Sequence, residues 1–166
     1  MAASKTAYAG GAFDPSQPLN LTGPVFVSGL SIPIISGSGA TVTLTAAQSG
    51  ATVLFDRAAG IIFTLPAPQL GMYFDFVTTV SITSNNATVL TDAATTFVLG
   101  QVVNSVAAGT NTIFFANGTS HVKLQSNGTT TGGLIGSQYR FTCVSATVWN
   151  VTGIINGSGV IATPFA

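Results

Sequence analysis

The stretch TVTLTAAQSGATVLFDRAAGIIFTLPAP, residues 41–68, decides the fold of this chain. It contains three short segments rich in Val, Ile, Thr and Phe, at 41–45, 52–55 and 61–65. The first alternates polar and apolar residues, which is typical of a half-buried β-strand. Pro66 and Pro68 cannot donate to a strand ladder and predict the end of the third segment. The stretch therefore predicts short β-strands joined by tight turns.

The rest of the chain after residue 24 continues this pattern. Further strands are expected at 72–77, 79–83, 88–90, 97–103, 112–116, 121–125, 138–144, 147–155 and 160–163. Residues 45–49 could form one helical turn, but residues that favour helices are too scarce for a long helix. Roughly ten to twelve short strands predict an all-β fold, an antiparallel sandwich, jelly roll or barrel. The absence of a strict internal repeat weighs against a solenoid.

Two hairpins are expected from the turn residues. Asn117-Gly118 tolerates positive φ at both positions and predicts that 112–116 pairs with 121–125. The segments 138–144 and 147–155 predict a second hairpin. Asp75 alternates with Phe74 and Phe76, so its side chain should point away from the core.

Residues 1–24 read as an extended N-terminal arm preceding a single domain of residues 25–166. The arm holds Gly10-Gly11 and several prolines, and shows little periodicity. Two interpretations remain open: a disordered tail, or an arm that becomes ordered on a neighbouring molecule. In the second case Tyr8, Phe13 and Leu19 would be its anchors.

The composition indicates a protein that assembles. Only 5% of the 166 residues are charged, against about 25% in an average soluble domain, and the net charge is zero. Near-zero net charge promotes association between protein molecules. A permanent oligomer, or a component bound to a larger particle, would bury much of this weakly charged surface. The alternative is a monomer whose Thr, Ser and Asn side chains alone keep it in solution. The widely spaced Lys and Arg residues form no basic stripe, so nucleic acid is not expected as a partner.

The sequence shows no targeting feature. No uninterrupted apolar run is long enough for a transmembrane helix, and residues 1–5 lack a signal-peptide core. We expect synthesis in a cytoplasm and no membrane partner. Cys143 has no second cysteine to pair with and is expected to be a small buried hydrophobic residue.

Chemistry-bearing residues are too few to predict an enzyme. His121 is the one histidine, and the four acidic residues are widely spaced aspartates, Asp14, Asp56, Asp75 and Asp92. No Ser/His/Asp, Cys/His, paired-carboxylate, metal-ligand or phosphate-loop pattern emerges. We therefore expect no catalytic residue, no cofactor, no metal and no small-molecule ligand. Trp149 is a weak candidate for carbohydrate stacking, but its place in an expected strand favours the core.

The few charges could instead serve at subunit contacts. If copies pack about a three-fold axis, Arg57, Lys123 or Arg140 could pair across the seam with Asp75 or Asp92. Solvent exposure of these side chains is the plain alternative, and an exposed pair contributes only about 0–1 kcal/mol.

The segment between residues 40 and 103 also carries a family resemblance. Its threonine-rich strand, Ser49-Gly50 turn, apolar strand, Thr64-Leu-Pro-Ala-Pro68 and Gly71-Met-Tyr-Phe-Asp-Phe76 resemble a pattern in β-rich virion proteins of tailed bacteriophages. These include capsid decoration (cement) proteins and parts of tail or fibre assemblies. The resemblance implies a homotrimer that binds the major capsid protein on the outer surface of the assembled capsid and stabilises it. It carries over no catalytic residue. The alternative is a tail, fibre or baseplate component, which could bind a receptor or a glycan.

Overall fold

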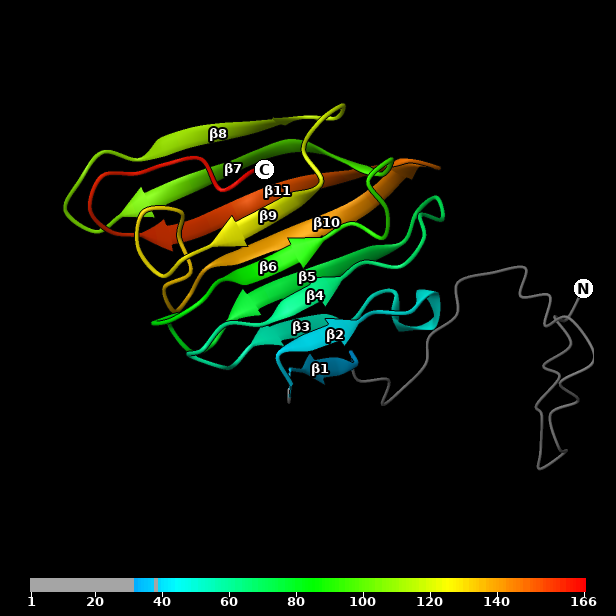
Figure 1. The fold of residues 1–166 in the computed structure, drawn as a ribbon, viewed down its shortest axis with the longest axis horizontal. Helices are drawn as coiled ribbons and strands as arrows, with labels where there is room; N and C mark the ends of the chain where they lie inside the picture. Colours follow the sequence, from blue (N-terminus) through cyan, green and yellow to red (C-terminus); the bar gives the residue numbers. More distant parts are fainter. Residues whose placement is uncertain (1–31, 38) are drawn as a thin grey trace, which may run out of the picture. The chain divides into compact units, whose positions relative to one another are not determined.

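The computed structural model describes residues 32–37 and 39–166, and in these it confirms the predicted all-β class (Figure 1). The expected anchors Tyr8, Phe13 and Leu19 lie outside the described residues. The strands are β1 (Ile34–Ser36), β2 (Thr41–Thr43), β3 (Thr52–Phe55), β4 (Ile62–Thr64), β5 (Tyr73–Thr78), β6 (Ala87–Leu90), β7 (Phe97–Val106), β8 (Thr112–Asn117), β9 (Lys123–Ser126), β10 (Gln138–Ser145) and β11 (Val148–Gly157). A short 3₁₀ helix, η1 (Ala46–Gln48), follows β2 and confirms the predicted helical turn. The Gln48 side chain accepts a hydrogen bond from the Thr45 amide, at 2.8 Å.

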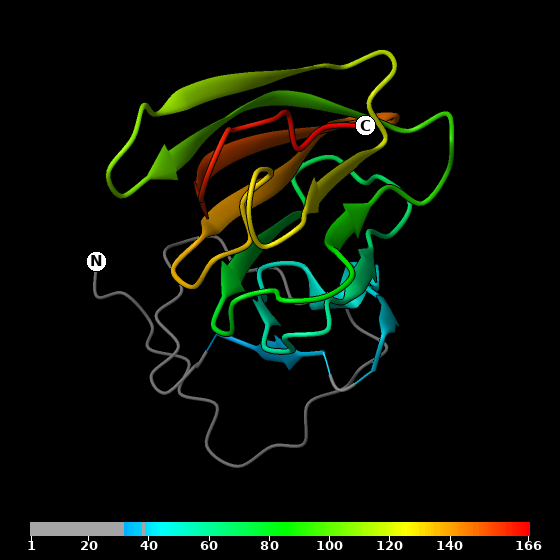
Figure 2. The same cartoon turned by 60° about the vertical axis from the view of Figure 1, so that its left-hand side comes forward.

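The strands form two sheets that share one core, so the domain is a sandwich (Figures 1 and 2). The larger sheet has seven strands in the order β1-β3-β5-β10-β11-β7-β8. The smaller has four, in the order β2-β4-β6-β9. Both sheets are mixed rather than purely antiparallel, because consecutive strands in the first half of the chain belong to different sheets.

The first six strands wind between the two sheets like the coils of a solenoid. Strands β1, β3 and β5 pair in parallel in the larger sheet, and β2, β4 and β6 do so in the smaller one. The register stacks Val42, Phe63 and Val89 in one column of the smaller sheet. The domain as a whole is a sandwich, as expected, but this half winds like a solenoid even though its sequence shows no strict repeat. The connections between coils differ in length, which hides the repeat from the sequence.

The second half of the chain closes the larger sheet. The predicted hairpin of β10 and β11 is confirmed, with Phe141 opposite Val151 and Cys143 opposite Trp149. Strand β7 then pairs in parallel with β11 and antiparallel with β8. This leaves β8 at one edge of the seven-stranded sheet.

The hairpin predicted across Asn117-Gly118 was wrong. Strand β8 pairs with β7, and β9 pairs with β6 in the other sheet. The Asn117 side-chain oxygen accepts hydrogen bonds from the amides of Thr119 and Ser120, both at 3.0 Å. The resulting wider turn takes the chain from one sheet to the other, where Leu124 lies opposite Val89.

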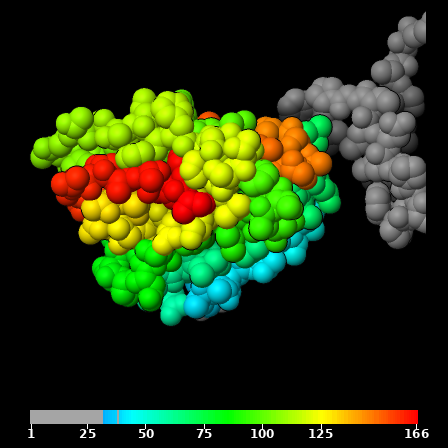
Figure 3. Space-filling view, turned by 45° about the horizontal axis from the view of Figure 1, so that its top comes forward, coloured from blue at the N-terminus to red at the C-terminus, as the bar shows by residue number. Residues whose placement is uncertain are grey.

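Two further expected strands are also absent from the structure. The amides of Thr79 and Val80 both donate hydrogen bonds to the carbonyl of Phe55, at the end of β3. Residues 79–83 therefore bend towards the loop after β3 and do not extend strand β5. Residues 160–163 form no strand either. Instead, Phe165 makes an antiparallel bridge with Leu124, and the C-terminal segment (red) lies beside the β9 region (yellow) on the surface (Figure 3).

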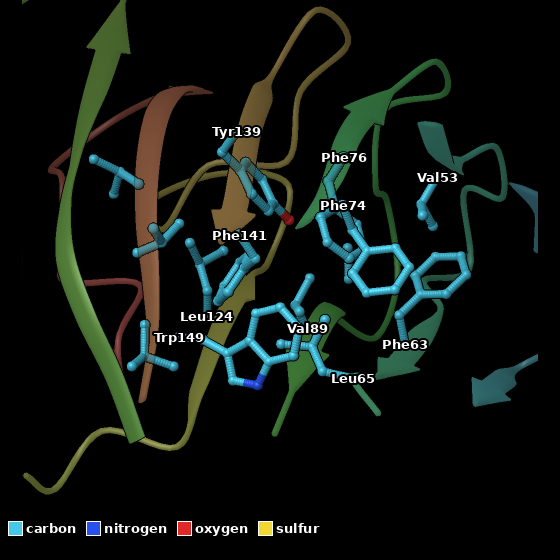
Figure 4. Packing of buried hydrophobic residues seen from close by; sticks show 14 of the residues in the cluster. Val53, Phe63, Leu65, Phe74, Phe76, Val89, Leu124, Tyr139, Phe141 and Trp149 are labelled. Carbon is cyan, nitrogen blue, oxygen red and sulfur yellow. The ribbon is translucent and has the colours of Figure 1, made fainter. Parts of the chain in front are cut away.

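The core between the sheets is built on aromatic rings (Figure 4). Phe63 meets Phe55 edge-on at 5.1 Å between ring centroids, and Phe76 stacks on Tyr139 at 5.6 Å. Trp149 is fully buried, as expected for a core residue. A buried aromatic side chain of this size contributes about 1.5–3 kcal/mol relative to exposure, so this cluster anchors one sheet on the other.

Candidate interaction surfaces

The residues that could take part in catalysis lie apart from one another, and their side chains make local contacts. His121 Nδ1 accepts a hydrogen bond from the Asn117 amide, at 3.1 Å, and the ring lies 5.8 Å from that of Phe165. Asp56 accepts a hydrogen bond from the Ser36 hydroxyl. Within residues 32–37 and 39–166, no three His, Cys, Asp or Glu side chains cluster as metal ligands would. In the same residues no helix is long and apolar enough to cross a membrane.

Cys143, a residue of β10, is buried, as expected. Its Sγ lies 3.1 Å from the carbonyl oxygen of Ser145. Burial raises the pKa of the Cys143 thiol, which favours the unreactive protonated form. Its role is that of a small apolar side chain opposite Trp149.

The outer face of the seven-stranded sheet carries two rows of side chains that differ in character. The register aligns a polar row of Thr52, Asp75, Arg140, Thr152 and Gln101, which ends at the apolar Phe115 on β8. A second row runs beside it and consists of Leu54, Val77, Gln138, Ile154, Val103 and Ile113. Five of these six side chains are apolar. An apolar row therefore crosses six strands on the side of the sheet away from the core, with Ile113 and Ile154 exposed and the other apolar side chains half-buried.

The apolar row widens at the β8 edge. Phe115 and Ile113 on β8 are 67% and 52% exposed. Leu99 on the adjacent β7 is 41% exposed, and Ile154 on β11, the next strand along, is 47% exposed. Strands β7, β8 and β11 contain no charged residue. An edge strand that no further described strand pairs with, that exposes an aromatic side chain and that carries no charge is a template for pairing with another chain. We call this region, made of Leu99, Val103, Ile113, Phe115 and Ile154, the β8 patch.

Two neighbouring residues of the polar row, Asp75 and Arg140, form an ion pair. Arg140 Nε donates to Asp75 Oδ1 and Arg140 Nη2 donates to Asp75 Oδ2, both at 2.7 Å. The Arg140 guanidinium also lies 4.6 Å from the centroid of the Tyr73 ring. Hydrogen bonding to Asp75 raises the pKa of Arg140 above its ordinary value. Arg140 is thus satisfied within its own chain.

A groove of about 500 Å³ crosses the outer face of the four-stranded sheet. Its floor includes Ile62 and Leu90, and Arg57 and Lys123 line it from two different elements, the loop after β3 and strand β9. The rest of the lining comprises five residues with polar side chains and four small or apolar residues: Thr41, Asn85, Asn86, Thr88 and Gln125, and Ala40, Ala59, Gly60 and Ile61. We call this the Arg57–Lys123 groove.

One wall of the groove is built from two loops held together by hydrogen bonds. The amide of Thr83 donates to the carbonyl of Ala58, at 2.8 Å, and the Asn85 side chain donates to the carbonyl of Ala59, at 3.2 Å. Gly60 has a φ of 76°, and a Cβ there would lie 2.5 Å from the Asn86 carbonyl oxygen. The wall is therefore closely packed, and glycine at position 60 allows that packing.

No family model, no curated protein and no solved structure matches this chain.

The structure separates the three charged side chains expected at subunit contacts. Arg57 and Lys123 line the same groove, although they are far apart in sequence. Arg140 lies on the opposite sheet and pairs with Asp75 inside the chain rather than across a seam. Sequence reasoning missed Ile113 and Phe115 as surface residues. Their alternation with Phe114 was the available signal, but it could not say which of the two faces was buried.

Proposed function

We propose that this chain is a structural protein of a tailed-bacteriophage virion that coats the assembled capsid as a homotrimer. The observation that carries the proposal is the β8 patch, an uncharged apolar surface beside a strand edge that no other described strand pairs with. The resemblance of residues 40–103 to capsid decoration proteins supplies the virion context. The partners are other copies of the chain and the major capsid protein.

Self-association accounts for the composition of the β8 patch. Interface centres are depleted of charge and enriched in aromatic side chains, and the β8 patch has no charged residue and exposes Phe115. Burying Phe115 and Ile113 in a contact between subunits would stabilise the oligomer, because both side chains are exposed to water in the isolated chain. In a three-fold ring the contact is heterologous, so the patch of one copy meets a different surface of the next.

Capsid binding would stabilise the shell by mass action. Whatever binds the assembled state and not its dissociated parts shifts the equilibrium towards assembly. A surface rich in Thr, Ser and Asn, with few charges, suits extended contacts repeated over many equivalent positions. Bound protein should therefore raise the temperature at which capsids release their genome.

The deciding experiment is the copy number and position of the protein on purified virions, by quantitative mass spectrometry and particle imaging. On the order of hundreds of copies spread over the shell is the expected result. A handful at one vertex would replace the proposal with the tail, fibre or baseplate alternative. Absence from purified particles would reject both.

A further inference from the structure

The Arg57–Lys123 groove has an unbalanced positive charge. Arg57 and Lys123 are both in its lining, which includes no aspartate or glutamate. In the part of the chain that the structure describes, the ion pair found is Arg140–Asp75, on the other sheet. Asp56, adjacent to Arg57 in sequence, is directed to the Ser36 hydroxyl. Two of the few cations of a nearly uncharged chain thus converge on one concave surface.

The remaining lining narrows the chemical class of the ligand. Ile62 and Leu90 provide an aliphatic floor, and the amides of Asn85, Asn86 and Gln125 can both donate and accept hydrogen bonds. No aromatic side chain lines the groove, so it lacks the platform on which a sugar ring or a nucleobase would stack. Two cations are also too few for strong binding to a nucleic acid backbone.

We propose that the Arg57–Lys123 groove binds an extended acidic peptide segment, with its carboxylates at Arg57 and Lys123. Apolar side chains of the segment would rest on Ile62 and Leu90, and its backbone amides would hydrogen-bond to Gln125 and the asparagines. The arginine guanidinium matches a carboxylate with two parallel hydrogen bonds. This inference rests on the proposed function, because it assigns the segment to the protein surface on which this chain assembles.

The packed wall makes the groove a preformed site. The bonds from Thr83 to Ala58 and from Asn85 to Ala59 hold the two loops that carry Arg57 and Asn85. A ligand would then pay little to order the backbone around it. Binding should still be weak and salt-sensitive, because exposed charges in an open groove are screened by ions.

The test uses the purified full chain and two synthetic peptides, monitored by NMR. One is a capped peptide of alternating aspartate and valine, and the other replaces every aspartate with asparagine. We expect the acidic peptide to shift the amide signals of Thr88 and Gln125, and the asparagine peptide to leave them unchanged. Arg57→Gln and Lys123→Gln should each weaken binding about threefold, and together about tenfold. Arg140→Gln, which removes a cation from the opposite sheet, is the matched control and should bind as the wild type does.

Other outcomes would overturn the inference. Equal binding of both peptides would remove carboxylates from the mechanism. Shifts caused by a sulfated oligosaccharide but not by the acidic peptide would reassign the groove to a glycan. Loss of binding in Arg140→Gln equal to that in the groove variants would show a nonspecific charge effect.

Virion measurements separate this inference from the proposed function. If the wild-type protein coats capsids and the double variant R57Q/K123Q coats them equally well, the groove inference fails and the proposed function stands. If the acidic peptide binds but the protein is absent from virions, the proposed function fails while the groove remains a site for acidic peptides.

Discussion

Asp75 and Arg140 face each other across strands β5 and β10 and form a two-pronged ion pair, with both N–O distances at 2.7 Å. The pair lies on the solvent side of the seven-stranded sheet, where the side chains are 34% and 52% exposed. It sits on the strands that bury Phe76 and Phe141 on their other face. Its geometry is close to ideal, yet its exposure limits what it contributes.

We predict that Asp75→Asn and Arg140→Gln each lower the free energy of unfolding by no more than about 1 kcal/mol, since water and salt screen exposed pairs. Urea unfolding at low and at high salt measures this, and the double variant isolates the coupling between the two side chains. A loss above about 2 kcal/mol for either single variant would indicate that the pair is buried by a partner, for example in the assembled oligomer.

Gly60 and Gly71 form a matched pair for testing the groove wall. Both adopt positive φ, at 76° and 86°, so alanine is strained at either position. A Cβ at Gly60 would meet the Asn86 backbone at 2.5 Å, whereas one at Gly71 would meet nothing within 4 Å. We predict that Gly60→Ala lowers the free energy of unfolding by at least about 1 kcal/mol more than Gly71→Ala does. Equal losses in urea unfolding would mean that the two loops are not held in contact.

Tyr139 makes the domain sensitive to alkaline pH. Burial raises the pKa of this phenol above its ordinary value of about 10. Above pH 10 the unfolded chain releases the phenolic proton and the folded chain keeps it, so the free energy of unfolding must fall as pH rises. The raised pKa of Cys143 acts in the same direction from a lower pH, near 8.5.

We predict that Tyr139→Phe removes most of the loss of stability above pH 10 and changes stability little at pH 7. Chemical unfolding at a series of pH values between 7 and 11 measures the slope. An unchanged slope in Tyr139→Phe would show that another group controls alkaline unfolding. In the double variant Y139F/C143A the free energy of unfolding should depend less on pH than in either single variant, because neither the phenol nor the thiol is then present to titrate.

Phe115 tests the role of the β8 patch. We predict that Phe115→Lys leaves the free energy of unfolding of the monomer within about 0.5 kcal/mol, because the ring is 67% exposed. It should nevertheless abolish self-association, since it places a charge in an apolar contact. Sedimentation velocity measures the oligomeric state.

Val160→Lys is the control for this prediction. Val160 is 87% exposed and lies outside the strands, so the same charge there should leave self-association intact. Oligomers that persist in Phe115→Lys would move the subunit contact away from the β8 patch. Dissociation in both variants would point to net charge, rather than to this surface, as the cause.

Several local features of the fold could be predicted from the sequence alone. Residues 52–55 were expected as a strand and form β3 with those bounds, because apolar β-branched and aromatic residues stand between turn residues. The outward direction of Asp75 followed from its alternation with Phe74 and Phe76. The candidate site was predictable only in part, since Arg57 and Lys123 were named but not recognised as neighbours in one groove.

What the sequence determined by itself was the all-β class, most of the segments that form strands and the alternation of side chains within them, because these depend on residues adjacent in the chain. The strands expected at 79–83 and 160–163 were exceptions, since their backbone groups bond to distant loops instead. Only the tertiary structure decided how the strands pair. Lys123–Ser126 pairs with β6 rather than β8, and the first six strands wind alternately through two sheets. Pairing depends on which distant edge is free and on how the loops close, and no local pattern carries that information. The β8 patch and the Arg57–Lys123 groove are products of that pairing, and so they become visible only in the folded chain.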